Sequence, residues 1–237
     1  MTYALVADCV SKAFGHRRVL SSASLRAKRG EVRAIFGRNG EGKSTLLKIA
    51  TGLLQPDAGT VRMGDTVFTR ASLPMLAARG VFYLPDHDVL APVYRLGMQL
   101  GLFERRFGQG RAIDAARLAG IDHLLDRRVV SLSGGELRRA ELALAITRSP
   151  TVLIADEPYR GIAPVDHDRL TTLFRTMAAG GCAVVVTGHE VPSLLAAADH
   201  VTWCTSGTTY ELGSASAACA HDGFRRGYLG PTVRAPG

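Results

Sequence analysis

The sequence predicts an α/β fold that combines a mainly parallel sheet with an N-terminal antiparallel β subdomain and an inserted helical subdomain. Strands and helices alternate in the last third of the chain, which is typical of a parallel sheet with helices on its faces. Strand-like runs at 3–9 and 20–27 come before the first buried strand, at 32–36. The stretch 91–130 is mostly helical and interrupts the alternation, so we expect it to be an insertion.

The elements follow in chain order from hydrophobic periodicity. After the strand VRAIF at 32–36, the segment KSTLLKIATGLL has the apolar spacing of a helix. QPDAGTVRMGDTVF predicts a turn and a β-hairpin, and VFYL at 81–84 predicts a second buried strand. A mostly helical pattern runs from Ala91 to Ile146, with a break at FGQGR. The later elements are a strand TVLIAD, a helix near 165–179, a strand CAVVVT, a helix near 190–198, a strand HVTWC and a frayed tail GPTVRAPG.

Composition indicates a globular protein. With 237 residues, 46% hydrophobic and 21% charged, the chain can bury a sizeable core in one large domain. No window approaches 18 consecutive apolar residues, and the start MTYALVADCV lacks the basic region of a signal peptide. The cysteines are scattered, with no CxxC pair, which predicts reduced thiols and a cytoplasmic location.

The formal net charge is +8, but the basic residues form scattered doublets rather than a block. Aromatic residues make up only 6% and do not interleave with these doublets, as stacking platforms for bases would. We therefore expect a basic solvated surface and no nucleic-acid partner. A docking face for anionic lipid or nucleic acid is the alternative that the charge leaves open.

The most informative motif is GRNGEGKST at 37–45, which matches the P-loop pattern between a buried strand and a helix. Glycines in such a loop let backbone amides close on the α- and β-phosphates, the lysine reaches the β- and γ-phosphates, and the serine hydroxyl binds Mg²⁺. A glycine-rich turn with a chance lysine is the plainer alternative. The predicted nucleotide-binding residues here are Gly37, Asn39, Gly40, Gly42, Lys43, Ser44 and Thr45, with Ser44 also a metal ligand and Lys43 also catalytic.

Polar residues at strand ends supply the other candidates. VLIADE ends a buried strand with two acids: Asp156 fits a Mg²⁺ ligand and Glu157 fits the base that deprotonates the attacking water. His189 follows the strand CAVVVT, at the sheet edge where ligands bind in such folds. Phe14 lies upstream of the P-loop, where an aromatic ring could stack on adenine, although a lone phenylalanine is more often a core residue.

A second glycine loop, SLSGGE, comes directly before another helical pattern. Because the backbone amides at a helix N-terminus can bind an anion, this loop is a second candidate anion site. Taken together and in this order, the motifs resemble the ATP-binding subunits of ABC transporters over nearly the whole chain. SLSGGE resembles their signature motif, KAFGHRRVL the adenine-stacking loop, VLIADEP Walker B and TGHE the switch histidine. DEPYRGIAP and FRRGYLG resemble, within that family, the cassettes of branched-chain amino-acid uptake and lipopolysaccharide export.

The resemblance implies a P-loop NTPase core of the RecA-like type that binds ATP and Mg²⁺. It divides one ATPase domain into 1–86 (nucleotide-binding core with the antiparallel β subdomain), 87–150 (helical subdomain with the signature motif) and 151–237 (the rest of the core). It also implies that two cassettes pack head to tail, so that Ser133, Gly134 and Gly135 of one chain hold the γ-phosphate bound on the other. Integral membrane permease subunits are the expected further partners, on the inner face of the cell membrane.

Two positions depart from the family pattern. Asp86, in YLPDHD, replaces a glutamine that touches Mg²⁺, and Ala163 replaces an aspartate that makes a contact across the dimer. Asp86 is still a candidate metal ligand, although an ionised carboxylate donates no hydrogen bond. Neutral drift in a working cassette and an asymmetric heterodimer with a second cassette both fit these changes. A soluble ABC ATPase, for example of the iron–sulfur assembly type, a P-loop kinase and a low-turnover regulatory module are the rival functions.

Overall fold

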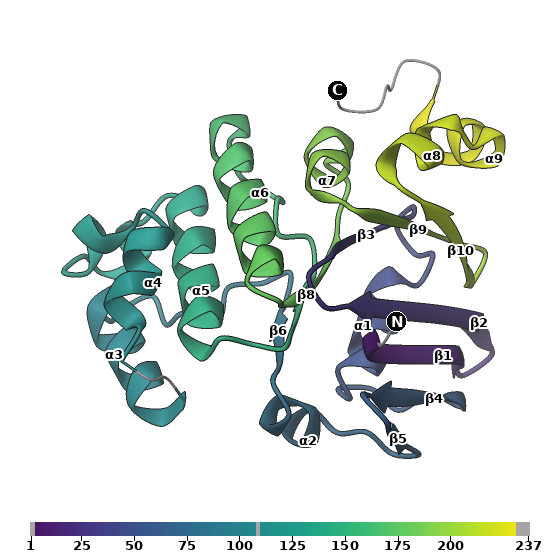
Figure 1. Cartoon of the computed structure of the whole chain (residues 1–237), viewed down its shortest axis with the longest axis horizontal. Coiled ribbons are helices and arrows are strands. Elements are labelled where there is room, and N and C mark those ends of the chain that lie inside the picture. Colours follow the sequence, from purple (N-terminus) through teal and green to yellow (C-terminus); the bar gives the residue numbers. More distant parts are fainter. Residues whose placement is uncertain (1–2, 108–109, 231–237) are drawn as a thin grey trace.

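The computed structural model describes residues 3–107 and 110–230 of the chain. Within these residues one ten-stranded sheet has the order β5-β4-β1-β2-β10-β9-β3-β8-β7-β6, and helices gather along it (Figure 1). The predicted α/β class is confirmed. Two parts of the sheet differ in direction, because strands near the N-terminus pair antiparallel and the strands of the centre pair parallel.

The parallel part forms the core of the molecule. Its strands are β9 (His200–Thr205), β3 (Val32–Phe36), β8 (Ala183–Thr187), β7 (Val152–Ala155) and β6 (Val81–Leu84), in that spatial order. The inner three are buried at every residue, as expected for strands covered on both faces. All five strands run in one direction, so their carboxyl ends meet at one edge of the sheet, where loops carry the polar residues of the chain's motifs.

The antiparallel part is larger than the sequence indicated. It contains β1 (Tyr3–Phe14), β2 (Arg17–Lys28), β4 (Ala58–Met63) and β5 (Thr66–Phe68), and β10 (Thr208–Gly213) joins it to the core. The first two strands are each 12 residues long. Register shifts along β1, one of them where Asp8 and Cys9 are exposed, break the alternation that would have revealed its full length.

The two faces of the sheet carry separate hydrophobic cores. Side chains of β3 alternate between them, so Ala34 and Phe36 pack on one face and Ile35 on the other. The first face is covered by α3 (Leu96–Phe107), α4 (Ala112–Leu118), α5 (Gly134–Arg148), α6 (Pro164–Ala179), α7 (Val191–Ala197) and α8 (Ala215–Ala220). The second face is covered by α1 (Lys43–Ala50), α2 (Leu73–Ala78) and strands β1, β2 and β4.

The helices α3, α4 and α5 lie together at one end of the molecule, away from β1, β2, β4 and β5 (Figure 1). This position agrees with the expected insertion, while the domain boundaries at 86/87 and 150/151 stay a prediction.

The sequence did not reveal β10, α2, α8 or the short helix α9 (Asp222–Phe224) with the π-helical turn Arg225–Leu229. Parts of the FGQGR break and of the predicted tail lie outside the described residues. In the described ranges, no helix combines the length and apolar character needed to cross a membrane.

A P-loop site at the carboxyl edge of the sheet

The loop 37–42 connects β3 to the N-terminus of α1. At two of its positions, Gly37 and Gly42, the surrounding atoms leave no room for a side chain. A Cβ on Gly37 would overlap the carbonyl oxygen of Cys204. Gly42 has φ +100°, in the left-handed region that favours glycine, and a Cβ there would lie 2.5 Å from Leu20 Cδ2. Gly42 is also the N-cap of α1, and no side chain of the described residues caps this helix end. The free amides at the helix N-terminus therefore face the loop, which is the arrangement that binds phosphate.

Lys43 places a cation inside this loop. The residue is 6% exposed, and its Nζ donates to the carbonyl oxygens of Gly37 at 2.7 Å and Arg38 at 3.3 Å. Burial lowers the pKa of the Lys43 ammonium, while the negative charges of Glu157 and Asp156 act in the opposite direction. Among the described residues, the hydrogen-bond partners of this buried ammonium are carbonyls of its own loop, which leaves its positive charge suited to an incoming anion.

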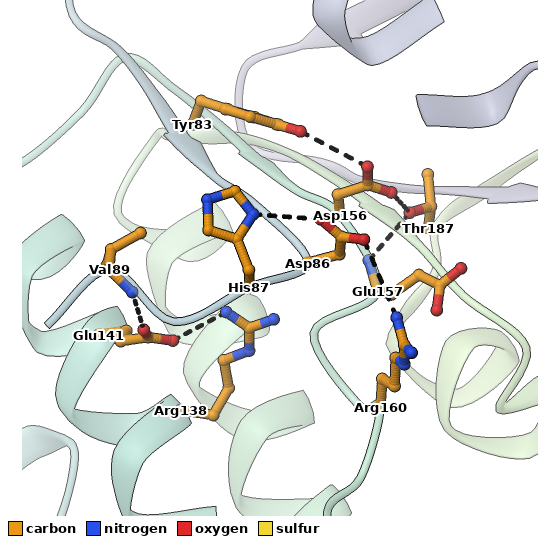
Figure 2. Close-up of polar contacts among 10 residues, drawn as sticks. All are labelled: Tyr83, Asp86, His87, Val89, Arg138, Glu141, Asp156, Glu157, Arg160 and Thr187. Atoms are coloured by element: carbon orange, nitrogen blue, oxygen red, sulfur yellow. Dashed lines mark hydrogen bonds and ion pairs between the residues drawn. The ribbon is translucent and has the colours of Figure 1, made fainter. Parts of the chain in front are cut away.

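The acid pair follows β7 and is held by a threonine of the neighbouring strand (Figure 2). Thr187 Oγ1 donates to Asp156 Oδ1 at 2.6 Å and accepts from the backbone N–H of Glu157 at 3.0 Å. Asp156 is 1% exposed, and the Tyr83 hydroxyl lies 3.5 Å from its second oxygen. Burial, followed by the charge of Asp156, raises the pKa of Tyr83, so this hydroxyl stays protonated. The carboxylate of Asp156 is thus fixed by neighbours on β8 and β6.

Glu157 has φ +47°, a left-handed backbone conformation that few residues other than glycine adopt. This conformation turns the chain between Asp156 and the segment that follows, and its cost is of the order of 1 kcal/mol. The Glu157 carboxylate lies 3.3 Å from Nε2 of His189, which follows β8. Strain of this kind persists where surrounding contacts fix the backbone, and here the Glu157 N–H bond to Thr187 is such a contact.

Two adjoining cavities bring most of the predicted site residues together. One, of about 230 Å³, is lined by residues of the P-loop and by Glu157; the other, of about 300 Å³, is lined by Glu157, His189 and Arg160, and both include Asn39. From the predicted set, the first cavity contains Asn39, Gly40, Gly42, Lys43, Ser44, Thr45 and Glu157. Side chains predicted separately from three motifs therefore share one location at the carboxyl edge of the sheet.

Asp86 lies in the β6–α3 loop and is half-exposed. One of its oxygens is 3.9 Å from Nη1 of Arg160 and the other is 3.4 Å from Nδ1 of His87 (Figure 2). Burial and the charge of Asp156 are the larger causes of the raised pKa of Tyr83, and the charge of Asp86 adds to them. Arg160 was not among the predicted site residues.

Phe14 is half-exposed at the end of β1. It pairs in register with Arg17, and Arg17 lines the P-loop cavity. Phe14 itself does not line that cavity among the described residues, and its ring lies 5.9 Å from the ammonium of Lys12. An adenine-stacking role for Phe14 remains a prediction.

The signature loop lies elsewhere, at the N-terminus of α5. Ser133 is the N-cap: its Oγ accepts from the Glu136 N–H at 3.3 Å, and its own N–H donates to Glu136 Oε2 at 2.8 Å. A Cβ on Gly135 would overlap the carboxylate of Asp166, and Ser133 and Gly134 are exposed. Of the described residues that line the two P-loop cavities, none comes from this loop.

Among the site residues that the sequence analysis did not identify are Thr187 and Arg160, which contact the predicted acids. Thr187 ends the apolar strand β8 and bonds both members of the acid pair; a polar residue at the carboxyl end of a buried strand was the available signal. Arg160 approaches Asp86 from a separate loop, and nothing in the spacing of the two indicated that contact.

The site fits a nucleoside triphosphate with Mg²⁺. The uncapped helix N-terminus, the glycines without room for a Cβ and the buried Lys43 suit phosphate groups. Among the described residues, no group of three or more His, Cys, Asp or Glu side chains is arranged to hold a metal by itself. Oxygen ligands from Ser44, Asp156 and Asp86 would therefore bind Mg²⁺ together with phosphate, as is usual for this ion.

Fold and site define a P-loop NTPase. Residues 20–160 match the family model described as "ABC transporter", and the chain belongs to the ABC transporter family. It is 30% identical over 240 residues to the lipopolysaccharide export system ATP-binding protein LptB of Escherichia coli K12, covering 97% of this chain and 98% of that protein. It is 36% identical over 198 residues to the molybdenum import ATP-binding protein ModC of Mycobacterium tuberculosis H37Rv, covering 78% and 54%.

Solved structures agree on the fold. The ADP conformation of MJ1267, an ATP-binding cassette of an ABC transporter, matches with a TM-score of 0.87 at 23% identity, covering 98% of this chain and 100% of that one. CbiO1 of Clostridium perfringens, part of the ABC transporter complex cbiONQ, matches with a TM-score of 0.82 at 23% identity, covering 96% and 94%. The predicted family and the predicted P-loop NTPase fold are confirmed.

Proposed function

We propose that this chain is the ATP-binding and ATP-hydrolysing subunit of an ABC transporter and drives transport through separate membrane subunits. The observation that carries the proposal is the meeting of Lys43, Glu157 and His189 at one sheet edge. Nearly the full length of the chain also aligns with the ATP-binding protein of an export system.

The chain's own residues divide the work of hydrolysis. The loop 37–45 binds the phosphates through backbone amides, and Lys43 neutralises their charge. Ser44, Asp156 and Asp86 would hold Mg²⁺, and the bound ion would neutralise phosphate charge. Glu157 accepts the proton of the attacking water. His189, whose Nε2 lies 3.3 Å from the Glu157 carboxylate, orients that carboxylate.

The signature loop completes the site from a second cassette. Ser133 and Gly134 are exposed, and neither lines the P-loop cavities. We therefore infer that they do not contact the phosphates bound by the P-loop of their own chain. In a two-fold dimer each loop reaches the nucleotide of the other chain. ATP then forms part of the interface and favours closure, and hydrolysis removes that contribution.

A groove beside the helical segment is suited to a membrane partner. A cavity of about 540 Å³ lies between α2, β6 and α3 and is lined mainly by apolar residues, among them Leu73, Phe103 and Phe107. Arg106 and Arg148 lie over the Phe107 ring at 4.7 and 5.5 Å. This is where we place the coupling helices of the permease subunits, with the cassette on the inner face of the membrane. The soluble alternative is not favoured, because relatives of the chain are named as ATP-binding proteins of export and import systems.

The test uses a hydrolysis-deficient variant in native cells. Glu157→Gln keeps the shape of the side chain but removes the base, so Mg-ATP is expected to hold the dimer closed. The variant is extracted with detergent from membranes, and co-purifying proteins are identified by mass spectrometry. Polytopic membrane subunits are the expected partners, and a second, different cassette among them would identify a heterodimer. Recovery only from the soluble fraction, with soluble partners, would overturn the transporter assignment.

A further inference from the structure

The helix α5 contains a carboxylate whose role the proposed function leaves unexplained. Glu141 is 1% exposed, and its two oxygens have different partners (Figure 2). One accepts from Nη1 of Arg138 at 2.8 Å, and the other accepts from the backbone N–H of Val89 at 2.7 Å. Burial raises the pKa of Glu141, whereas Arg138 and the Val89 N–H act to keep the carboxylate ionised.

The two partners differ in what they connect. Arg138 and Glu141 are three residues apart on the same helix, so their ion pair joins no separate elements. Buried ion pairs can often be replaced by apolar side chains without loss of stability, so stability alone does not account for this one. The Val89 N–H, by contrast, belongs to the β6–α3 loop. The hydrogen bond to Val89 is therefore the contact through which Glu141 acts on another segment.

This hydrogen bond holds the first part of the β6–α3 loop, the stretch 85–89 that carries Asp86, at Val89. The stretch is held by the sheet just before it begins, where the Asp156 N–H donates to the Leu84 carbonyl at 2.8 Å. Asp86 lies between these two points, and the ion-pair partners of its side chain within 3–107 and 110–230 are the exposed Arg160 and His87. The position of Asp86 relative to Asp156 thus depends on the contacts at Leu84 and at Val89.

We propose that Glu141 is a positioning residue that sets the place of Asp86 at the metal side of the nucleotide site. Because Glu141 lies on α5, which begins at the signature loop, a displacement of α5 is transmitted to Asp86 through Val89. This inference rests on the proposed function, since it assigns the metal side to Asp86, Asp156 and Ser44.

The test replaces the buried pair by apolar residues in the full chain. Arg138→Met with Glu141→Leu leaves neither charge unpaired but removes the acceptor for the Val89 N–H. We expect hydrogen exchange at the Val89 amide to become at least tenfold faster. Mg²⁺ is expected to increase the affinity for ATP. We expect the Mg²⁺ concentration that gives half of this increase to rise severalfold, while the affinity for ATP without Mg²⁺ is unchanged. The matched control is Arg33→Met with Glu211→Leu, which removes an arginine–glutamate pair between β3 and β10.

The outcomes separate the two proposals. An unchanged Val89 exchange rate, or faster exchange with an unchanged Mg²⁺ requirement, overturns the role of Glu141. If the wild-type protein does not bind Mg-ATP, the proposed function fails instead, while the exchange rate still reports on the contact. If the double variant does not fold, the Mg²⁺ requirement is compared between Glu141→Gln and Glu141→Met. Glutamine keeps an acceptor for the Val89 N–H and should retain the wild-type requirement, whereas methionine has no such oxygen and should raise it. Equal requirements in the two variants would overturn the proposal.

Discussion

Single residues at the site differ sharply in their surroundings. Lys43 and Asp156 are almost fully buried, whereas Asp86 is half-exposed and its partner Arg160 is more exposed still. Substituting a buried charge leaves its partners unpaired, while an exposed pair is screened by water and salt. We therefore expect changes at Lys43 to abolish function and changes at Arg160 to adjust it.

Lys43→Ala should lower the affinity for ATP at least a hundredfold, because the loop loses the cation that its carbonyls hold in place. Isothermal titration with ATP measures this. Lys48→Ala is the control, since Lys48 lies on the same helix but is exposed. ATP binding in Lys43→Ala as strong as in the control would remove the basis of the P-loop assignment.

Arg160→Gln should lower the Mg²⁺ concentration needed for tight ATP binding two- to threefold, because Arg160 no longer competes for the Asp86 carboxylate. Its effect on stability should stay below about 0.5 kcal/mol, as for other exposed pairs. The same substitution in an Asp86→Gln background should have no effect on the Mg²⁺ requirement. Equal effects in both backgrounds would show that the two side chains act independently.

Elements were predictable where their pattern is local. The strand β3, the P-loop and α1 follow from a buried run, a glycine loop and helical spacing within 32–50. β10 was missed because TTYELG is polar and mostly accessible, and it is a strand only because β9 and β2 flank it. Site residues follow the same rule: Lys43 and Glu157 belong to contiguous motifs. Thr187, in contrast, gains its role from the parallel pairing of β7 with β8, which no single segment reveals.

Thr187→Val tests that pairing of strands. Valine has nearly the shape of threonine but cannot donate to Asp156, so we expect a loss of about 1–3 kcal/mol in stability and at least a tenfold lower hydrolysis rate. Thr202→Val is the matched control, since Thr202 is equally buried and hydrogen-bonded to Arg33 and Glu211 away from the acid pair. Denaturant unfolding and ATP turnover are measured on both. A similar fall in turnover in the two variants would contradict a specific role for Thr187.

At the scale of the whole molecule, the two loops predicted to bind phosphate line no common cavity in the described part of the chain. The P-loop lines the cavities at the sheet edge, and the signature loop is exposed at the start of α5. This separation is the reason for proposing a dimer with shared sites. Ala163, the exposed N-cap of α6, offers no side-chain cap and no polar group to a partner, so an asymmetric pair with a second cassette stays an alternative.

Ser133→Arg should prevent dimer closure, because a long cation would occupy the space that the partner's nucleotide needs. In a Glu157→Gln background with Mg-ATP, we expect a monomer by light scattering, with ATP binding to the monomer intact. Ser131→Arg adds the same charge two residues earlier at an exposed position and should still dimerise. A closed dimer of the Ser133→Arg protein would contradict the shared-site arrangement.

The left-handed backbone of Glu157 has a consequence for laboratory evolution. Glycine, and to a lesser degree asparagine, adopts this conformation more easily than glutamate, so either substitution should relieve strain there. Both would also remove the proposed base. A library screened only for heat resistance would therefore enrich variants that have lost turnover, and a useful screen would have to select for ATP hydrolysis at the same time.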